Sequence, residues 1–351
     1  MVATVLLSSF DRSLLVYEGT HHSHFIAEAD NDSAVHQIEN KLHSLFIHHF
    51  DTHCFTGNVR ALVVERNRKM AESAHAYVRG STKRFYEWLS QSEHAEIPTG
   101  PAIWICGDCH SGNLRPVANG DGALAIQIRD LNQTVIGNPV HDLIRLALSL
   151  AMAARSSDLP GVTTALMLER MIDGYSKAFI TDAGTTTMPS TMKALMREAA
   201  KRSWKHLADE RIEGEVRQLP IGPRFWPLTW FEKEAIEAMF AEQRVEELVS
   251  ALPGDGTSGE VKVVDAAFWK KGCSSLGRIR VAALLAIGKG SGKAFRLMDI
   301  KEAVASSAPR VLNAIMPVDN AGRVVDGARH LSPYLGSKAG TVNPASCRAH
   351  A

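Results

Sequence analysis

The spacing of apolar residues changes along this chain, and that change limits the possible folds more than any other feature. Up to Leu252, apolar residues often recur three and four positions apart, which predicts helices. Beyond it, short apolar runs bounded by glycine predict strands between residues 261 and 300. The glycine-rich segment 252–259 between the two parts is typical of a loop. We therefore expect an α+β protein whose helical part precedes a smaller β-rich part.

The boundaries of the expected elements follow from the same patterns. Two short apolar runs inside the helical part predict strands at 102–106 and 123–128. The predicted helices cover residues 59–73, 81–90, 138–155, 163–180, 190–207 and 230–252, and the later strands cover residues 261–264, 278–287 and 294–300. The chain is accordingly divided into an N-terminal extension (1–58), a helical lobe (59–252), a β-rich lobe (260–336) and a polar tail (337–351).

Composition excludes several classes of partner. Lys and Arg number 39 and Asp and Glu number 38, so the net charge is +1, too small for a global field that holds nucleic acid or an anionic membrane. No apolar stretch reaches the ~18–20 residues of a membrane helix. The first apolar run lacks preceding basic residues, and five cysteines are too sparse for a disulfide scaffold. We expect a cytoplasmic protein that binds neither nucleic acid nor a membrane.

Three polar residues follow the predicted strands in an order that suits phosphoryl transfer. Asp108 follows the first strand, Asn113 lies shortly after it, and Asp130 follows the second strand. In such a reaction one carboxylate accepts the proton of an acceptor hydroxyl, while an amide and a second carboxylate hold Mg²⁺ against the nucleotide phosphates. These residues are therefore a candidate catalytic and metal site.

Two cysteines in the same stretch leave another interpretation open. Cys106-x-x-Cys109-His110 has the spacing of a haem-attachment motif, and the two cysteines alone have that of a redox pair. Haem attachment normally requires export, and the redox motif lacks its usual strand-then-helix context. Two small buried side chains that flank a turn explain the same pattern.

The motif Gly107-Asp-x-His-x-x-Asn113 resembles the catalytic loop of the aminoglycoside phosphotransferase branch of the protein-kinase-like superfamily. The resemblance implies that Asp108 is the catalytic base. His110 is a second candidate catalytic residue, which either orients the loop or simply forms hydrogen bonds inside it. Asn113 and Asp130 would then bind the metal, with ATP and Mg²⁺ as cofactors. The acceptor substrate is not indicated by the sequence.

The similarity is closer still to a bacterial family known as domain of unknown function 2252. The shared motifs are Lys69-Met-Ala-x-Ser73, Tyr77-x-Arg-Gly80, the loop 107–113, Asp142-Leu-x-Arg-Leu146, Gly272-x-Ser-Ser-Leu-Gly277 and Ile300-Lys-Glu-Ala303. Asp142 resembles the later aspartate that buttresses the catalytic loop in the aminoglycoside phosphotransferase branch. Arg129, Asn132 and Gln133 stand where the family usually has an acidic cluster. That departure leaves open an alternative function, a catalytically weak or inactive nucleotide-binding pseudokinase or scaffold.

The expected nucleotide lobe follows the catalytic loop. The first hundred residues contain only scattered glycines, whereas Gly272–Gly277 forms a cluster between predicted strands and Lys301 ends a later one. This is the order of a phosphate-covering loop and its lysine, although a plain hairpin turn and a surface lysine would give the same pattern. The predicted nucleotide-binding residues are Gly272, Ser274, Ser275, Gly277 and Lys301. We therefore expect a two-lobed, protein-kinase-like fold that is circularly permuted, with Glu302 or Asp326 as the acid that pairs with Lys301.

Overall fold

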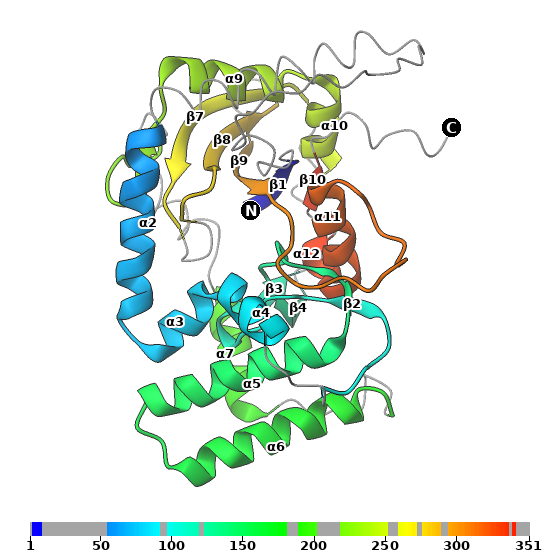
Figure 1. The fold of residues 1–351 in the computed structure, drawn as a ribbon. Coiled ribbons are helices and arrows are strands. Elements are labelled where there is room, and N and C mark those ends of the chain that lie inside the picture. The colour runs from blue at the N-terminus through cyan, green and yellow to red at the C-terminus, as the bar shows by residue number, and fades with distance from the viewer. Residues whose placement is uncertain are drawn as a thin grey trace, which may run out of the picture.

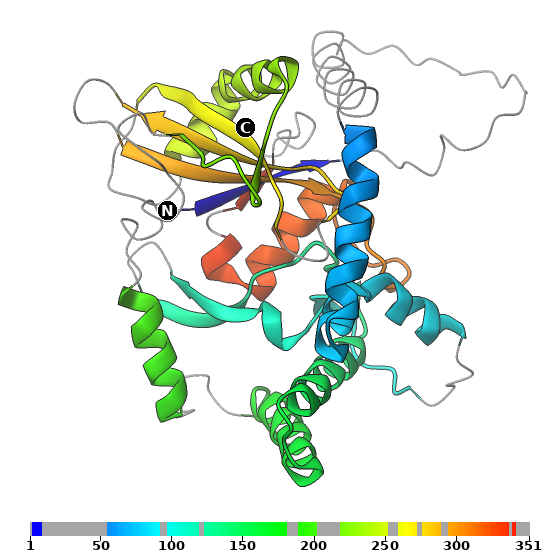
Figure 2. The same cartoon turned by 90° about the vertical axis from the view of Figure 1, so that its left-hand side faces the viewer.

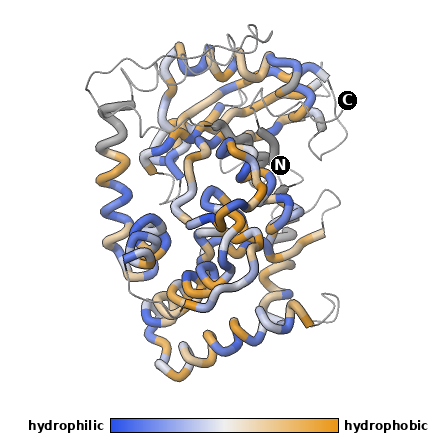
Figure 3. Tube along the Cα trace, turned by 45° about the vertical axis from the view of Figure 1, so that its right-hand side comes forward, coloured by the Kyte–Doolittle hydropathy of each residue, from blue (hydrophilic) through white to orange (hydrophobic). Residues whose placement is uncertain are grey.

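The chain adopts a mixed α+β fold, seen in a computed structural model (Figure 1). The structure describes residues 2–8, 55–91, 97–118, 123–180, 189–201, 218–251, 259–271, 276–288, 294–336 and 339–341. Within these ranges, no helix combines the length and the apolar character that crossing a bilayer requires. Figure 3 shows apolar and polar stretches alternating along the helices instead.

The largest sheet joins segments from both ends of the chain. Its strands are β1 (Val2–Ser8), β6 (Phe225–Pro227), β7 (Val261–Trp269), β8 (Arg280–Ile287), β9 (Ala294–Ala303) and β10 (Ala339–Thr341). They are arranged in the order β10-β1-β9-β8-β7-β6. The strands from β6 to β9 pair antiparallel, whereas β1 is parallel to both β9 and β10. Every residue of β8 is buried, which makes it the central strand of the core.

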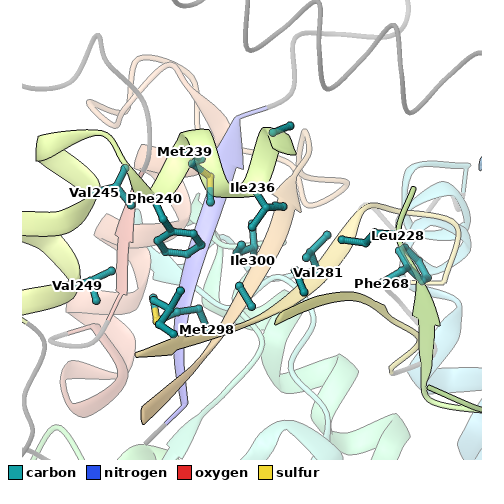
Figure 4. Packing of buried hydrophobic residues seen from close by; sticks show 14 of the residues in the cluster. Leu228, Ile236, Met239, Phe240, Val245, Val249, Phe268, Val281, Met298 and Ile300 are labelled. Carbon is teal, nitrogen blue, oxygen red and sulfur yellow. The ribbon is translucent and has the colours of Figure 1, made fainter. Parts of the chain in front are cut away.

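One face of this sheet is covered by α9 (Trp230–Phe240) and α10 (Gln243–Ala251), as Figure 4 shows. Thr229 and Glu232 form a capping box that satisfies backbone amides at the start of α9. The buried side chains of this layer include Ile236, Met239, Phe240, Val245, Val249, Val281, Met298 and Ile300. Full burial of one such side chain stabilises the fold by roughly 1.5–3 kcal/mol, so this layer holds the two helices on the sheet.

Most of the helical part lies below the large sheet in Figure 1. It consists of α2 (Phe55–Ala71), α3 (Ala74–Gly80), α4 (Thr82–Gln91), α5 (Pro139–Ser156), α6 (Gly161–Lys177) and α7 (Ser190–Lys201). In Figures 1 and 2, α2 runs from the level of the sheet down to the lower helices. At the start of α5, the Asn138 side chain accepts the amide of Val140, and Pro139 occupies the first turn.

Two small sheets and a helix pair lie between these parts. β2 (Ile103–Ile105) pairs with β5 (Val135–Gly137), and β3 (Leu114–Ala118) pairs with β4 (Leu124–Ile128). The short helix η4 (Ser111–Asn113) directly precedes β3. Figure 2 shows α11 (Asn320–Leu331) and α12 (Pro333–Gly336) between the large sheet and these strands. Because α11 contacts β1 and β9 as well as β2 and β5, it connects the two parts.

The structure differs from the expected elements chiefly in three places. The helix predicted at 230–252 is interrupted by a turn at 241–242, between α9 and α10. The predicted extension and polar tail contain β1 and β10, which both pair within the large sheet. Residues 74–80, for which no element was predicted, form α3 behind the N-cap Ser73. Residues 202–207 of another predicted helix lie outside the described residues.

Gly327 provides a test of how closely α11 approaches the segment before β5. A Cβ at this position would stand 2.6 Å from Thr134 Oγ1 and closer still to Cγ2. We expect Gly327→Ala to lower the free energy of unfolding by about 1–3 kcal/mol through overpacking, although alanine itself favours a helix. The matched control is Gly174→Ala in α6, where the added Cβ meets nothing within 4 Å. Urea unfolding should show a stabilised control, and a stabilised Gly327→Ala variant would contradict the close packing.

Candidate active site

A sharp turn after β2 places the Asp108 loop. Gly107 has a φ of +70°, and a Cβ there would collide with the Gln133 carbonyl, so only glycine fits without strain. The Gly107 carbonyl accepts the hydroxyl of Tyr86 at 2.8 Å. These contacts seat the loop between α4 and the segment that follows β4.

The Asp142 carboxylate anchors the same turn from the first turn of α5. Its two oxygens accept the backbone amides of Cys106, at 2.6 Å, and Gly107, at 2.9 Å. Burial raises the pKa of Asp142 to about 6, against the opposing effect of these two hydrogen bonds. At neutral pH the carboxylate is therefore largely ionised and holds both amides. This is the contact that a buttressing aspartate requires.

Arg145 binds the Asp108 carboxylate in the protein interior. Its Nε and Nη2 donate to Asp108 Oδ1 at 2.9 and 2.6 Å, and Nη2 also donates to the Val78 carbonyl and the Thr82 hydroxyl, each at 2.8 Å. Arg145 is 0% exposed and Asp108 5% exposed. A local pair with Asp142, the ordinary expectation for a residue three positions away, is not what the structure shows. Instead Arg145 joins α3, α4 and α5 to the loop.

The same loop brings Asn113 beside Asp130. The Asn113 side-chain amide donates to the Asp108 backbone carbonyl at 3.0 Å. The backbone carbonyl of Asn113 accepts the backbone amide of Arg129 at 3.0 Å. Asp130 directly follows Arg129, so this hydrogen bond brings Asp130 close to Asn113 along the chain. Its Oδ1 is shielded from solvent and has no hydrogen-bond partner. Burial acts to raise the pKa of Asp130, but the charges of Lys301 and Arg280, together with a hydrogen bond from the Asn132 backbone, hold the pKa below its usual value.

Lys301 belongs to a charged row on the sheet. It lies opposite Arg280 in the antiparallel register of β8 and β9, and Arg280 Nε donates to Asp299 Oδ1 at 2.8 Å. Alternate residues of a strand share a face, so these three side chains lie on the face opposite Val281 and Ile300. We call Asp108, Asn113, Asp130, Arg280, Asp299 and Lys301 together the polar centre. The structure thus brings all four residues of the expected catalytic, metal and lysine sites to one region.

Neither acid expected to pair with Lys301 does so. Glu302 follows Lys301 in β9 and points to the opposite face, where its carboxylate accepts the Ile279 amide at 3.0 Å. Asp326 forms an ion pair with Arg329 at 3.1 Å on the exposed side of α11. The acids that sense the Lys301 charge are Asp130 and Asp299, whose pKa values it lowers against the effect of burial.

The expected glycine loop is described only in part. Gly272, Ser274 and Ser275 lie outside the described residues. Gly277 has a φ of +93°, and it lies close to α2, where an added Cβ would stand 3.7 Å from Val63. Arg278, which follows it, is a neighbour that the sequence reasoning missed. Burial lowers the pKa of Arg278, and Glu302, Asp130 and Asp108 act to raise it, which locates its guanidinium near the polar centre.

Lys271 and Trp269 extend the cationic side of the polar centre. The Lys271 ammonium lies 4.1 Å from the centre of the Trp269 ring, and the Arg280 guanidinium carbon lies 5.2 Å from it. Burial and the charge of Arg280 lower the pKa of Lys271 to about 7. Several cationic side chains therefore gather at the end of β7, β8 and β9 that faces Asp130.

The residues that replace the family's acidic cluster have structural contacts. The Gln133 side-chain oxygen accepts the Ser307 amide at 2.6 Å, and its carbonyl accepts the Ser306 hydroxyl at 2.6 Å. The Arg323 guanidinium donates to the carbonyls of Asn132, Thr134 and Val304. These contacts tie the Asp130 loop to the segment that leaves β9, so they position the carboxylate rather than add charge beside it.

The remaining candidates are two thiols and one imidazole. Cys106 and Cys109 are buried free thiols, and burial, with the charge of Asp142, raises the pKa of both, as in an inert structural thiol rather than a redox pair. His110 is also buried, and burial and the charges of Arg79 and Arg145 lower its pKa to about 4. It is therefore neutral at pH 7.

A metal at this site would have few protein ligands. The described residues contain no group of three or more His, Cys, Asp or Glu side chains that could hold an ion. Mg²⁺ is often bound by one or two carboxylates together with substrate phosphates and water. The unpartnered Asp130 Oδ1 beside Asn113 fits that type of site. The chemistry of the donor set therefore agrees with Mg²⁺ bound jointly with a phosphate ligand.

Comparison with known sequences identifies one family. Residues 58–348 match the family DUF2252, described as an uncharacterized protein conserved in bacteria. The match covers α2 to β10 and includes every residue of the polar centre. Searches of curated proteins and of solved structures returned no significant match.

The Arg145–Asp108 pair generates a stability prediction. Arg145→Met leaves a buried carboxylate without its cation, so we expect the free energy of unfolding to fall by about 3–5 kcal/mol. Adding Asp108→Asn to that variant removes the orphaned charge and should recover part of the loss. Arg170→Met, on the exposed surface of α6 with a weak pair to Asp173, should change stability little. Urea unfolding measures all of these, and strictly additive effects of the first two substitutions would contradict the pairing.

Proposed function

The chain belongs to the DUF2252 family, and from its polar centre we propose that it is a kinase-like, ATP- and Mg²⁺-dependent phosphotransferase that acts on a hydroxyl acceptor. The observation that carries the proposal is the geometry of two groups: the Asp108 loop, where Asn113 bonds both Asp108 and Arg129, and the cross-strand neighbours Arg280 and Lys301, whose charges act on Asp130. Lys301 and Asp130 are far apart in sequence, yet the lysine charge lowers the pKa of the half-buried aspartate. A cation for phosphate and a carboxylate for Mg²⁺ are the two groups that nucleotide binding requires side by side.

The cationic row suits a polyphosphate. Arg280, Lys301 and Lys271 gather at one end of the sheet, while Asp299 neutralises only part of their charge. Arg278 adds a further guanidinium near Asp130. Bringing cations together costs free energy because they repel one another, and a bound anion removes that cost. Arginine also binds phosphate through paired hydrogen bonds.

Mg²⁺ would be held by Asp130 and Asn113 together with nucleotide phosphates. When bound, the ion supplies neutralisation of phosphate charge during transfer. Lys301 keeps the Asp130 carboxylate ionised and available for the ion. The contacts of Arg323 and Gln133 hold the loop that carries this carboxylate. The protein thus contributes positioning and fixed charge, which are the main sources of rate in phosphoryl transfer.

Asp108 is the proposed general base, and Arg145 is its positioning residue. Burial raises the pKa of Asp108, while Arg145 acts to lower it. A raised carboxyl pKa favours acceptance of a proton from an acceptor hydroxyl. Arg145 occupies Oδ1, so the orientation of the carboxylate is fixed. The proposal includes a permuted kinase-like arrangement, in which the Asp108 loop precedes the strands β7 to β9 that carry Lys301.

A nucleotide-binding scaffold without transfer is the second candidate. Two observations favour it: the Asp108 carboxylate is already engaged by Arg145, and the described residues offer no acidic cluster for a second metal ion. A scaffold of this kind would bind Mg²⁺ and nucleotide but would release no product. The two functions share the Asp130–Lys301 site and differ only in the role of Asp108.

Calorimetric titration with the non-hydrolysable analogue AMP-PNP tests the proposed site. We expect Mg²⁺-dependent binding that weakens by at least about tenfold in Asp130→Asn, because the metal loses its charged ligand. Asp173→Asn on the exposed surface of α6 is the matched control and should bind normally. Unchanged binding in Asp130→Asn would refute the site.

Asp108→Asn separates the two functions. It should leave AMP-PNP binding within about threefold of the wild-type value and, for a phosphotransferase, lower the slow hydrolysis of ATP by ~10²-fold or more. Phosphate release measures that rate. If the wild-type protein binds AMP-PNP but releases phosphate from ATP no faster than the Asp108→Asn variant, the result favours the scaffold.

The pH dependence of nucleotide affinity tests the role of Lys271. Its pKa of about 7 means that the ammonium loses its proton as the pH rises through 7. A bound polyphosphate favours the charged form, so affinity for Mg²⁺·AMP-PNP should fall between about pH 6 and pH 8.5. Lys271→Gln should flatten this slope. The control Lys270→Gln, whose ammonium lies over Trp226 instead, should retain it, and equal slopes in both variants would contradict the assignment.

A further inference from the structure

Two arginines of the β3–β4 hairpin have no role in the site described above. Arg115 lies in β3 opposite Gln127 of β4, and Arg129 comes two residues after Gln127. Alternate residues of a strand share a face, so the two arginines are diagonal neighbours on one side of the hairpin. Both residues are exposed, so a ligand in solution can reach them. We call Arg115 and Arg129 the hairpin arginines.

Hydrogen bonds place the hairpin arginines beside the Asp108 loop. Arg115 Nε donates to the Gly112 carbonyl at 3.2 Å, and the backbone amide of Arg129 donates to the Asn113 carbonyl at 3.0 Å. Arg129 also directly precedes Asp130. The hairpin arginines therefore border the two residues that are proposed to hold Mg²⁺.

The large sheet meets the loop after β4 through apolar packing. In Figures 1 and 2 the β3–β4 hairpin lies below this sheet. Ala303 comes two residues after Lys301 in β9 and shares its face. Ala303 packs in one buried cluster with Leu131, the residue after Asp130. The Lys301 face of the sheet and the hairpin arginines therefore border the same loop.

The two layers contribute more cations than acids at this loop. The cations are Arg115 and Arg129 of the hairpin and Lys271, Arg280 and Lys301 of the sheet end. The acids of the polar centre beside them are Asp130 and Asp299, and Arg280 binds Asp299 at 2.8 Å. Among the described residues, no acid forms an ion pair with either hairpin arginine or with Lys301. The excess positive charge therefore has no counterpart in the described part of the chain.

Repulsion within this group of cations makes an anionic ligand favourable. Like charges on neighbouring strands destabilise a sheet. Partial burial and the charge of Arg115 lower the pKa of Arg129, and Arg280 acts in the same direction against Asp299. Mg²⁺ held by Asp130 would add further positive charge. A bound polyanion removes the repulsion, and each phosphate added to a chain supplies more of the negative charge that is needed.

The apolar side chains on this side of the sheet offer no open surface for a base. They lie in a buried cluster of Leu219, Phe225, Ala267, Trp269, Ala282 and Leu297. The Trp269 ring faces the Lys271 ammonium, which lies 4.1 Å from its centre. Nucleobases bind by stacking on accessible aromatic or apolar side chains. Within the described residues, a ligand beside Lys301 therefore meets charged groups rather than a stacking surface.

We propose that the polar centre and the hairpin arginines together bind a linear inorganic polyphosphate, which serves as a phosphoryl donor alongside ATP. The donor role rests on the proposed phosphotransferase function, whereas binding of the chain does not. The terminal phosphate lies beside Lys301, and the chain continues along Arg129 and Arg115. In transfer, the acceptor oxygen forms a bond to the terminal phosphorus, and its proton passes to Asp108. The bond from that phosphorus to the bridging oxygen breaks, and the chain leaves one phosphate shorter.

Calorimetric titration of the full-length protein with short-chain linear polyphosphate and Mg²⁺ tests the binding. We expect a saturable site whose affinity falls roughly tenfold or more in Arg115→Gln, because a charge-assisted contact is lost. AMP-PNP has a shorter phosphate chain and should lose less affinity in the same variant. Arg84→Gln is the matched control, since this arginine is exposed on α4, and it should bind both ligands like the wild-type protein. Arg115→Lys keeps the charge and should recover part of the affinity, which distinguishes a lost contact from a misfolded variant.

A single-stranded oligonucleotide separates recognition of a phosphate chain from general attraction of polyanions. Its phosphates are more widely spaced and its bases need a stacking surface, so it should bind much more weakly than polyphosphate. Oligonucleotide binding as tight as polyphosphate binding overturns the proposal. Equal polyphosphate affinities of Arg115→Gln and Arg84→Gln overturn it as well. A protein that binds AMP-PNP but no polyphosphate overturns it too, and leaves the proposed nucleotide site intact.

Phosphate release with each donor tests the donor role. Asp108→Asn should lower phosphate release from polyphosphate as it lowers release from ATP. If polyphosphate binds but yields no phosphate while ATP does, the donor role is overturned. Polyphosphate binding that depends on Arg115 in a protein that does not bind AMP-PNP supports recognition of the chain and refutes the nucleotide site. If neither ligand binds, both proposals are overturned.

Discussion

One buried guanidinium organises the catalytic end of this protein. Arg145 reaches from α5 to the Asp108 carboxylate, the Val78 carbonyl and the Thr82 hydroxyl, and thereby joins three helices to one loop. A buried ion pair contributes little net stability, but loss of one partner is costly. The pair therefore specifies a single orientation of the carboxylate. The same loop carries Asn113, whose side-chain amide donates to the backbone carbonyl of Asp108.

The large sheet and the loop after β4 meet at the polar centre, and α11 fixes their relative position. The sheet contributes cations at the end of β8 and β9, whereas the loop after β4 contributes the Asp130 carboxylate. Arg323 on α11 spans the layers, because it donates to carbonyls on both the Asp130 loop and the segment after β9. The close approach of Gly327 to Thr134 brings the helix near enough for this. The electrostatic contact between Asp130 and Lys301 thus follows from packing some distance away.

Local patterns predicted much of the fold and part of the candidate site. The α+β class, most helices and the clustering of Asp108 with Asn113 depend on short-range spacing, which a sequence displays directly. Arg280 was missed because its role depends on strand register, and the partner of Arg145 was missed because the ion pair spans two distant segments. The sequence analysis expected Glu302 or Asp326 as the acid that pairs with Lys301. Successive residues of a strand point to opposite faces, however, so Glu302 lies on the face opposite Lys301. The strand β1 was hidden within a segment of mixed composition.

The parallel pairing of β1 with β9 joins segments separated by nearly the whole chain. Contacts of such high sequence separation form late, because the entropy of closing the intervening loop must first be overcome. During synthesis β1 therefore has no partner strand until β9, at residues 294–303, has left the ribosome. Until then β1 presents unpaired edges, the kind of surface on which nascent chains associate wrongly. Co-translational maturation of this fold is thus expected to depend on its last-made strands and on protection by chaperones.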